Sequence, residues 1–162
     1  MQNLKLRKAK IEDIKQIQDL INYFAQQDLM LPRSLNELYE NLRDSWVAEQ
    51  KNKIVGCCAL HISWNDLAEI KCLAVAKNRQ GKGVGKELVT VCLDEAGSFG
   101  AKKIFVLTYR QEYFRKFGFK KIKHTELPHK IWAECINCPK FPDCQEIALI
   151  KTIAYRNQDR VL

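Results

Sequence analysis

Residues 78–88, NRQGKGVGKEL, hold three of the chain's seven glycines within five positions, with one lysine between them and another just after. An apolar run at 67–76, LAEIKCLAVA, leads into this stretch, and apolar residues at helical spacing follow it from 84 to 96. A turn between a strand and a helix exposes the first N–H groups of the helix, which have no intrahelical partner. Because these groups and the helix dipole favour an anion, the stretch predicts a turn that binds phosphate or pyrophosphate.

Two common phosphate-binding loops do not fit this spacing. A Walker A loop would need Gly at position 80 and Ser or Thr at position 87, where the chain has Gln80 and Glu87. The dinucleotide fingerprint would need a glycine at a position held by Lys86 or Leu88. A tight turn that uses glycines for its geometry alone is the other interpretation of the same residues.

Hydrophobic periodicity predicts a mixed α/β domain around the turn. Strands are expected at 4–9, 45–50, 53–62, 67–76, 103–108, 119–124 and 145–153. Helices are expected at 11–26, at 35–42, from 84 to Gly97 or Gly100, and at 112–117. This order predicts one twisted mixed sheet of six to seven strands with helices on both faces, in a single domain at 1–154 followed by a polar tail at 155–162.

The 162 residues carry a formal net charge of +8, and 46% of them are hydrophobic. A basic protein attracts anionic ligands, but the charge is spread along the chain without a basic tract among aromatics, so nucleic acid is not the expected partner. No apolar stretch approaches the ~18 residues of a membrane span. The N-terminus lacks a signal-peptide pattern. We therefore expect a cytoplasmic protein without a membrane partner.

The motif Gln80-x-x-Gly83-x-Gly85, between a strand and an amphipathic helix, resembles the acetyl-CoA pyrophosphate loop of the GNAT superfamily of N-acetyltransferases. The predicted element order resembles that fold along nearly the whole chain. The resemblance implies acetyl-CoA as acetyl donor, no required metal, and a strand at 70–76 that splays from the strand at 103–108. The donor-binding residues that it implies are Leu73, Ala74, Val75, Gln80, Gly81, Lys82, Gly83, Val84, Gly85 and Lys86.

Glu69 lies on the strand that feeds the turn, although strands are depleted in glutamate. An ammonium group cannot attack a thioester, and a carboxylate shielded from water can remove its proton directly or through a water. Several members of the family place their general base here, and a carboxylate paired with a lysine on an exposed face is the alternative. For the acid that protonates the leaving thiolate, the family's tyrosine position holds Phe114, which leaves Tyr113, Thr108 and Tyr109 as candidates.

Three segments, AEIKCLAV, FVLTYRQEYFRKFGF and LPHKIWAECINCPKFPDCQEIAL, resemble the acetyltransferase domain of bacterial N-acetylglutamate synthases, above all their short stand-alone form. This implies a small amino-acid substrate, L-glutamate, acetylated on its α-amine in the first committed step of arginine synthesis. Leu31 and Arg33 lie at positions that form the wall of the acceptor site in the family. The resemblance implies that Arg33 is a glutamate-binding residue. Arg110 and Lys130 are further candidates by charge, because arginine and lysine bind carboxylates.

Four cysteines in apolar segments are predicted to be reduced core residues: Cys57, Cys58, Cys72 and Cys92. The other three, Cys135, Cys138 and Cys144, have a spacing that suits half of a zinc site, a redox-labile pair or a buried cluster. Three other functions stay open: an acetyltransferase for another small amine or a protein lysine, a non-catalytic acyl-CoA-binding regulator, and a nucleic-acid-binding module. The oligomeric state is also open, with a homodimer as one candidate.

Overall fold

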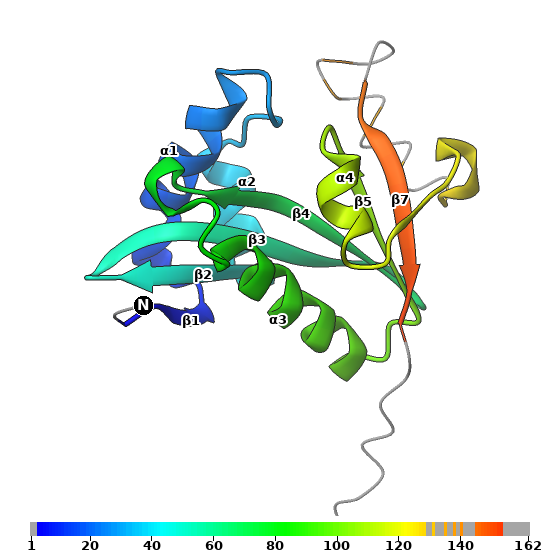
Figure 1. Ribbon diagram of the computed structural model, residues 1–162, viewed down its shortest axis with the longest axis horizontal. Coiled ribbons are helices and arrows are strands. Elements are labelled where there is room, and N and C mark those ends of the chain that lie inside the picture. The colour runs from blue at the N-terminus through cyan, green and yellow to red at the C-terminus, as the bar shows by residue number, and fades with distance from the viewer. Residues whose placement is uncertain are drawn as a thin grey trace, which may run out of the picture.

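The computed structural model describes residues 3–128, 131, 135, 138, 140 and 145–153. Within these residues a seven-stranded mixed sheet has the order β1-β2-β3-β4-β5-β7-β6 (Figure 1). The strands are β1 (Lys5–Lys8), β2 (Ser45–Gln50), β3 (Lys53–Trp64), β4 (Leu67–Val75), β5 (Lys103–Thr108), β6 (Lys120–Lys121) and β7 (Ile147–Thr152). The helices are α1 (Ile14–Ala25), α2 (Leu35–Glu40), α3 (Val84–Ser98) and α4 (Gln111–Arg115). The predicted mixed α/β sheet is confirmed.

Helices cover both faces of the sheet, each through an apolar stripe. On α1 the buried residues are Ile14, Ile17, Ile21 and Phe24, and they pack with Leu38 of α2 against one face. On α3 the buried residues are Val84, Leu88, Val89, Cys92 and Ala96, and they pack with Phe114 of α4 against the other face. The sheet is therefore buried on both sides, and a functional site needs an opening in this arrangement.

Local signals in the sequence set several of the element boundaries. Ser34 Oγ accepts a hydrogen bond from the Glu37 backbone N–H at 3.2 Å, and a Glu37 carboxylate oxygen accepts from the Ser34 N–H at 3.2 Å, so the predicted capping box starts α2. Lys51 and Asn52 both have positive φ angles, 51° and 59°, which suits the two-residue hairpin between β2 and β3. Gly100, with φ of +82°, follows the end of α3.

A β-bulge interrupts the pairing of β3 and β4. Cys57 pairs with Ala74 and Ala59 pairs with Lys71, so two steps along β3 face three steps along β4. Cys72 takes up the extra residue with φ of 57°, a left-handed conformation that side chains other than glycine rarely adopt. The bulge bends β4 in the middle of the sheet.

The same part of β4 separates from β5. The two strands pair in parallel from Leu67 and Lys103 to Ile70 and Val106, where the pairing ends. In Figure 1 β4 and β5 diverge above this point. The splay predicted from the family resemblance is therefore confirmed, and it opens the sheet between two central strands.

Three predictions need correction. The strand expected at 119–124 is short, because β6 covers Lys120–Lys121 and a 3-10 turn follows at His124–Glu126. The helix expected at 11–26 begins with a 3-10 turn, Ile11–Asp13. Cys57, Cys58 and Cys92 are buried and free, as expected, but Cys72 is only partly buried because the bulge turns this residue towards the opening.

Candidate active site

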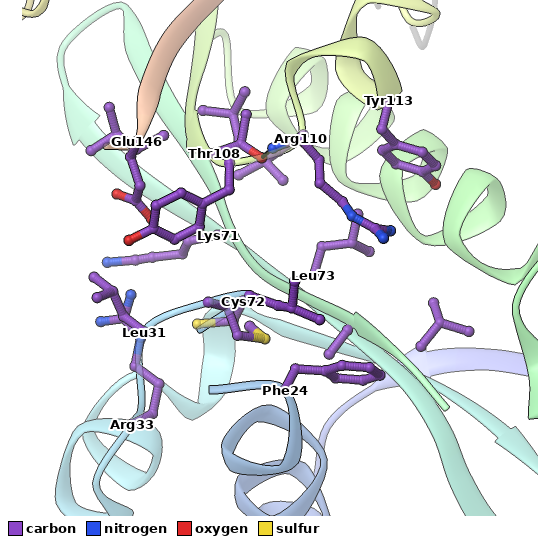
Figure 2. Close-up of a pocket in the computed structure, with 18 of the residues that line it drawn as sticks. Phe24, Leu31, Arg33, Lys71, Cys72, Leu73, Thr108, Arg110, Tyr113 and Glu146 are labelled. Atoms are coloured by element: carbon purple, nitrogen blue, oxygen red, sulfur yellow. Dashed lines mark hydrogen bonds between the residues drawn. The ribbon is translucent and has the colours of Figure 1, made fainter. Parts of the chain in front are cut away.

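A cavity of about 1250 Å³ lies where β4 and β5 diverge. It runs from the glycine turn before α3 to the loop between α1 and α2, and both segments line it. Figure 2 shows its side chains: Arg33 and Leu31 lie on one side, Tyr113 lies on the other, and Cys72 and Leu73 lie between them on β4. One continuous space therefore joins the predicted donor-binding turn to the predicted acceptor wall.

At the glycine turn the backbone faces open space. Gly81 and Gly83 have φ angles of +72° and +86°, and a Cβ atom built on either would meet nothing within 4 Å. The Gln80 side chain donates a hydrogen bond to the Val75 carbonyl at 3.1 Å, which ties the turn to the end of β4. Because α3 begins at Val84, its first N–H groups stand at this open surface, as the prediction of an anion site requires.

Arg79 adds a fixed positive charge beside the turn. Its Nε atom is buried, lacks a hydrogen-bond partner in the described part of the chain, and belongs to a side chain that lines the cavity. A buried donor without a partner is costly, and an anionic group would satisfy it. The open glycine backbone and this donor fit the diphosphate of CoA.

The predicted donor-binding residues divide into two groups. Those that line the cavity are Leu73, Ala74, Val75, Gln80, Gly81 and Gly85. Of the others, Val84 is a core residue 2% exposed, and Lys82 and Lys86 are exposed on the surface beside the turn. Backbone rather than side chains therefore forms the inner surface of the turn.

Tyr113 packs against the first turn of α3. A Cβ atom on Gly85 would lie 2.5 Å from the Tyr113 hydroxyl oxygen, so glycine permits this close approach. Burial raises the pKa of Tyr113, whose hydroxyl is protonated at neutral pH. Phe114, at the position where the family has its tyrosine, points into the core and is 4% exposed. Both residues line the cavity, but only Tyr113 brings a hydroxyl group to it.

Glu69 lines the cavity and is 8% exposed. The Lys71 ammonium lies 3.9 Å from a Glu69 carboxylate oxygen. His61 of β3 is the register partner of Glu69 across the sheet, and its side chain lines the same cavity. The expected alternative of a lysine-paired carboxylate is thus half right: a lysine lies beside Glu69, but the carboxylate is buried inside the cavity.

Three hydrogen bonds from α1 fix the loop that carries Arg33. The Arg33 carbonyl accepts from Gln18 and Asn22 side chains at 3.2 and 3.5 Å, and the Asn22 side chain accepts from the Arg33 N–H at 3.1 Å. The guanidinium lies 3.3 Å from a Glu37 carboxylate oxygen. Its buried Nε has no hydrogen-bond partner among the described residues. Arg33 therefore retains a directed donor at the cavity wall.

Thr108 is the last residue of β5, Arg110 lies two positions later, and both line the cavity. The Thr108 hydroxyl oxygen accepts a hydrogen bond from the Arg110 N–H at 2.9 Å, which leaves the hydroxyl hydrogen available. In Figure 2 the Arg110 guanidinium points away from Arg33 and towards the side of Tyr113. Arg110 is therefore grouped with the glycine turn rather than with the acceptor wall.

Two predicted residues, Lys130 and Cys144, lie outside the described residues. Cys135 and Cys138 line the cavity, and both are reduced cysteines. Among the residues that the structure describes, no group of three or more His, Cys, Asp or Glu side chains could hold a metal ion. A search of the same residues finds no helix with the length and apolar character needed to cross a bilayer.

His61 and Lys71 were not predicted from the sequence as site residues. Lys71 follows Glu69 by two positions, so it lies on the same face of the strand. The β3–β4 hairpin closes with the pair Trp64 and Leu67, so counting back from that pair would place His61 opposite Ile70. An irregularity between Ile62 and Trp64 shifts the register by one residue and brings His61 opposite Glu69. Arg79 lies within the stretch 78–88, and the sequence predicts that it adds positive charge beside the turn.

Comparisons with known proteins agree with this geometry. Residues 11–119 match the model of the acetyltransferase (GNAT) family. A Chlorobaculum tepidum protein named as an uncharacterized N-acetyltransferase is 37% identical over 91% of this chain and 96% of its own length. The amino-acid acetyltransferase of Mycobacterium tuberculosis is 35% identical over 80% of this chain and 75% of its own length.

A solved structure with bound ligands is also similar to this chain. The N-acetylglutamate synthase from Neisseria gonorrhoeae, complexed with coenzyme A and N-acetylglutamate, superposes with a TM-score of 0.84 at 26% identity over 95% of this chain. This chain spans 36% of that protein's length. With the splayed strands, the open glycine turn and the family match, these likenesses show that the chain belongs to the GNAT family and is an acetyl-CoA-dependent N-acetyltransferase.

Proposed function

We propose that this acetyltransferase transfers the acetyl group of acetyl-CoA to the α-amine of L-glutamate. One observation carries the proposal: the buried carboxylate of Glu69 shares the cavity with two cations that interact with it, the Lys71 ammonium at 3.9 Å and the Arg33 guanidinium. A base flanked by cations suits an acceptor with one amine and two carboxylates. The relatives named amino-acid acetyltransferase and the Neisseria complex with N-acetylglutamate support the same acceptor.

Binding of the donor falls to the glycine turn. The N–H groups at the start of α3 and the Arg79 guanidinium would hold the diphosphate, because both are positive donors at an open surface. The edge of β4 beyond Ile70 is released from β5, so its backbone near Leu73 and Val75 can pair with the pantetheine amides. Arg110, on the same side, would add positive charge near the phosphates.

Glu69 would remove the proton from the acceptor ammonium. Its carboxylate is buried at the cavity wall, and the Lys71 ammonium at 3.9 Å balances its charge before the proton arrives. The freed amine then attacks the thioester carbonyl. Tyr113 and Thr108, which both line the cavity, are the two hydroxyl groups proposed to protonate the departing thiolate.

The acceptor carboxylates would bind at Arg33, with Leu31 beside it, and at Lys71. Arg33 already has its loop fixed by α1, so little order has to be gained on binding. Lys130, which lies outside the described residues, stays a candidate for the same role by its charge.

A thiol-release assay with acetyl-CoA and a panel of amino acids tests this function. L-Glutamate should give the highest kcat/KM, with L-glutamine and L-aspartate at least tenfold lower, since each of them misplaces or removes one carboxylate. If a different amine is acetylated with higher kcat/KM, glutamate is the wrong acceptor. If no amine in the panel releases thiol while CoA still binds, the non-catalytic regulator is the better description.

A further inference from the structure

Asp44 and His61 form a hydrogen-bonded pair that the mechanism above does not use. The His61 Nδ1 atom lies 2.6 Å from an Asp44 carboxylate oxygen. Asp44 ends the 3-10 turn Leu42–Asp44, immediately before β2, and His61 lies on β3. A carboxylate on Nδ1 fixes the neutral imidazole with its hydrogen on Nδ1 and leaves Nε2 as the proton acceptor.

The pair lies directly across the sheet from Glu69. His61 and Glu69 are register partners on antiparallel strands, and directly opposite residues carry side chains on the same face, with Cβ atoms ~5 Å apart. Both side chains line the cavity. The charged groups acting on His61 are Asp44 of the 3-10 turn and Glu69 and Lys71 of β4, while Arg33 and Glu37 line the same cavity from the α1–α2 loop and α2.

Exposure to solvent increases from the Glu69 carboxylate to the His61 imidazole. The Glu69 side chain is 10% exposed, whereas the side chains of His61 and Asp44 are 33% and 27% exposed. A buried base that takes a proton in every turnover must lose it again before the next. Lys71, the cation beside Glu69, cannot accept the proton while it is itself protonated. The imidazole is the neighbouring group that can.

We propose that His61, oriented by Asp44, is the proton exit of the active site: it takes the acceptor's proton from Glu69 and passes it to solvent. This inference rests on the role proposed for Glu69 as the base. The proton balance is simple, because the ammonium proton moves to the Glu69 carboxylate and from there to His61 Nε2. The resulting imidazolium is stabilised by the Asp44 carboxylate and releases the Nε2 proton to water.

The hydrogen bond with Asp44 raises the pKa of His61. A relay needs His61 neutral when it receives the proton, so kcat should rise as the pH passes upward through this pKa. Removal of the Asp44 carboxylate lowers the pKa of His61, so the acid limb of the kcat profile should move to lower pH in Asp44→Asn. A purely structural role for the pair would reduce activity without moving that limb.

The decisive experiment is chemical rescue of His61→Ala. At saturating acetyl-CoA and acceptor, this variant should lose at least tenfold in kcat, within the range ascribed to positioned acid–base groups. The KM for acetyl-CoA should stay within about twofold, and added imidazole should restore kcat as its concentration rises. The matched control is His124→Ala, which removes an imidazole outside the cavity and should neither lose activity nor respond to imidazole.

Each outcome separates the two proposals. If Glu69→Gln keeps full activity, the base assignment fails and the exit fails with it. If Glu69→Gln is inactive but His61→Ala keeps kcat within threefold, or loses activity that imidazole does not restore, the exit alone is wrong. If His61→Ala melts below the assay temperature, Asp44→Asn decides, and an acid limb that does not move overturns the proposal.

Discussion

The walls at the two ends of the cavity consist of different groups, which are backbone at one end and side chains at the other. At the glycine turn the wall is backbone: Gly81 and Gly83 expose peptide groups, and Val84 turns its side chain into the core. At the acceptor end the wall is side chains from separate elements, with Arg33 in a loop and Glu69 on β4. In the proposed function, the peptide groups bind the diphosphate, which is the same in every acetyl-CoA molecule. Side chains can be exchanged without disturbing the fold, so the acceptor end is where specificity can change.

Glu69→Gln is the sharpest test of this contrast and should have the largest effect. The substitution preserves shape but removes the proton acceptor, so we expect kcat to fall by about 10²–10⁴-fold. The KM for acetyl-CoA should stay nearly constant, because the donor is held at the other end. Steady-state kinetics with both substrates varied measure this. Glu112→Gln, on the exposed surface of α4, is the matched control and should behave as wild type.

Arg33→Leu should act on the acceptor alone. A hydrogen bond to a charged group contributes ~1.5–3 kcal/mol, so the KM for glutamate should rise by about 10- to 100-fold. The KM for acetyl-CoA should change by less than about threefold. Arg115→Leu removes the same charge from α4, where Arg115 pairs with Glu112, and should change neither KM. An equal rise in both KM values for Arg33→Leu would contradict the division into two ends.

Gly83→Ala is the corresponding test at the glycine turn, where the acetyl donor is expected to bind. Its φ of +86° costs an alanine ~1 kcal/mol or more, and the added methyl group enters the open space in front of the turn. We expect the KM for acetyl-CoA to rise by about fivefold while the KM for glutamate stays unchanged. Gly97→Ala in the same helix is the control. Gly97 has no neighbour near its would-be Cβ, so alanine there should raise the melting temperature slightly.

The smallest effect concerns the contact between Tyr113 and Gly85. Gly85→Ala would place its methyl 2.5 Å from the Tyr113 hydroxyl, so it should lower the free energy of unfolding by about 1 kcal/mol. In a Tyr113→Phe background the obstructing oxygen is gone, and the same alanine should stabilise α3 by a few tenths of a kcal/mol or more. Urea denaturation of the four proteins measures the coupling. Additive free energies would show that the hydroxyl does not occupy this position.

The same division explains what could be predicted from the sequence. The turn was predictable because Gln80, Gly83 and Gly85 are close in sequence and their backbone role needs no partner. The order of strands and helices followed from periodicity, which depends on neighbours within one element. Element ends were less accurate, as with the short β6, because tertiary pairing decides where a strand stops.

The acceptor wall could be predicted only in part. Arg33 and Glu69 were identified through family resemblance, but His61 was not, since its role depends on which residues face each other across β3 and β4. The bulge at Cys72 changes that register by one residue, and no local signal marks a cysteine with positive φ. Tyr113 was named as a candidate acid, but its approach to Gly85 depends on how α4 packs against α3.

Because one uninterrupted space joins Gly81 to Arg33, the cavity also suggests how the enzyme could be inhibited. A compound that links the sulfur of CoA through a short acyl bridge to the nitrogen of an amino dicarboxylate would occupy both ends together. The second half would then bind at a high effective concentration, and the affinity would exceed that of either fragment. The donor half of such a compound would bind to many members of the family, and the acceptor half would make the compound selective for this enzyme.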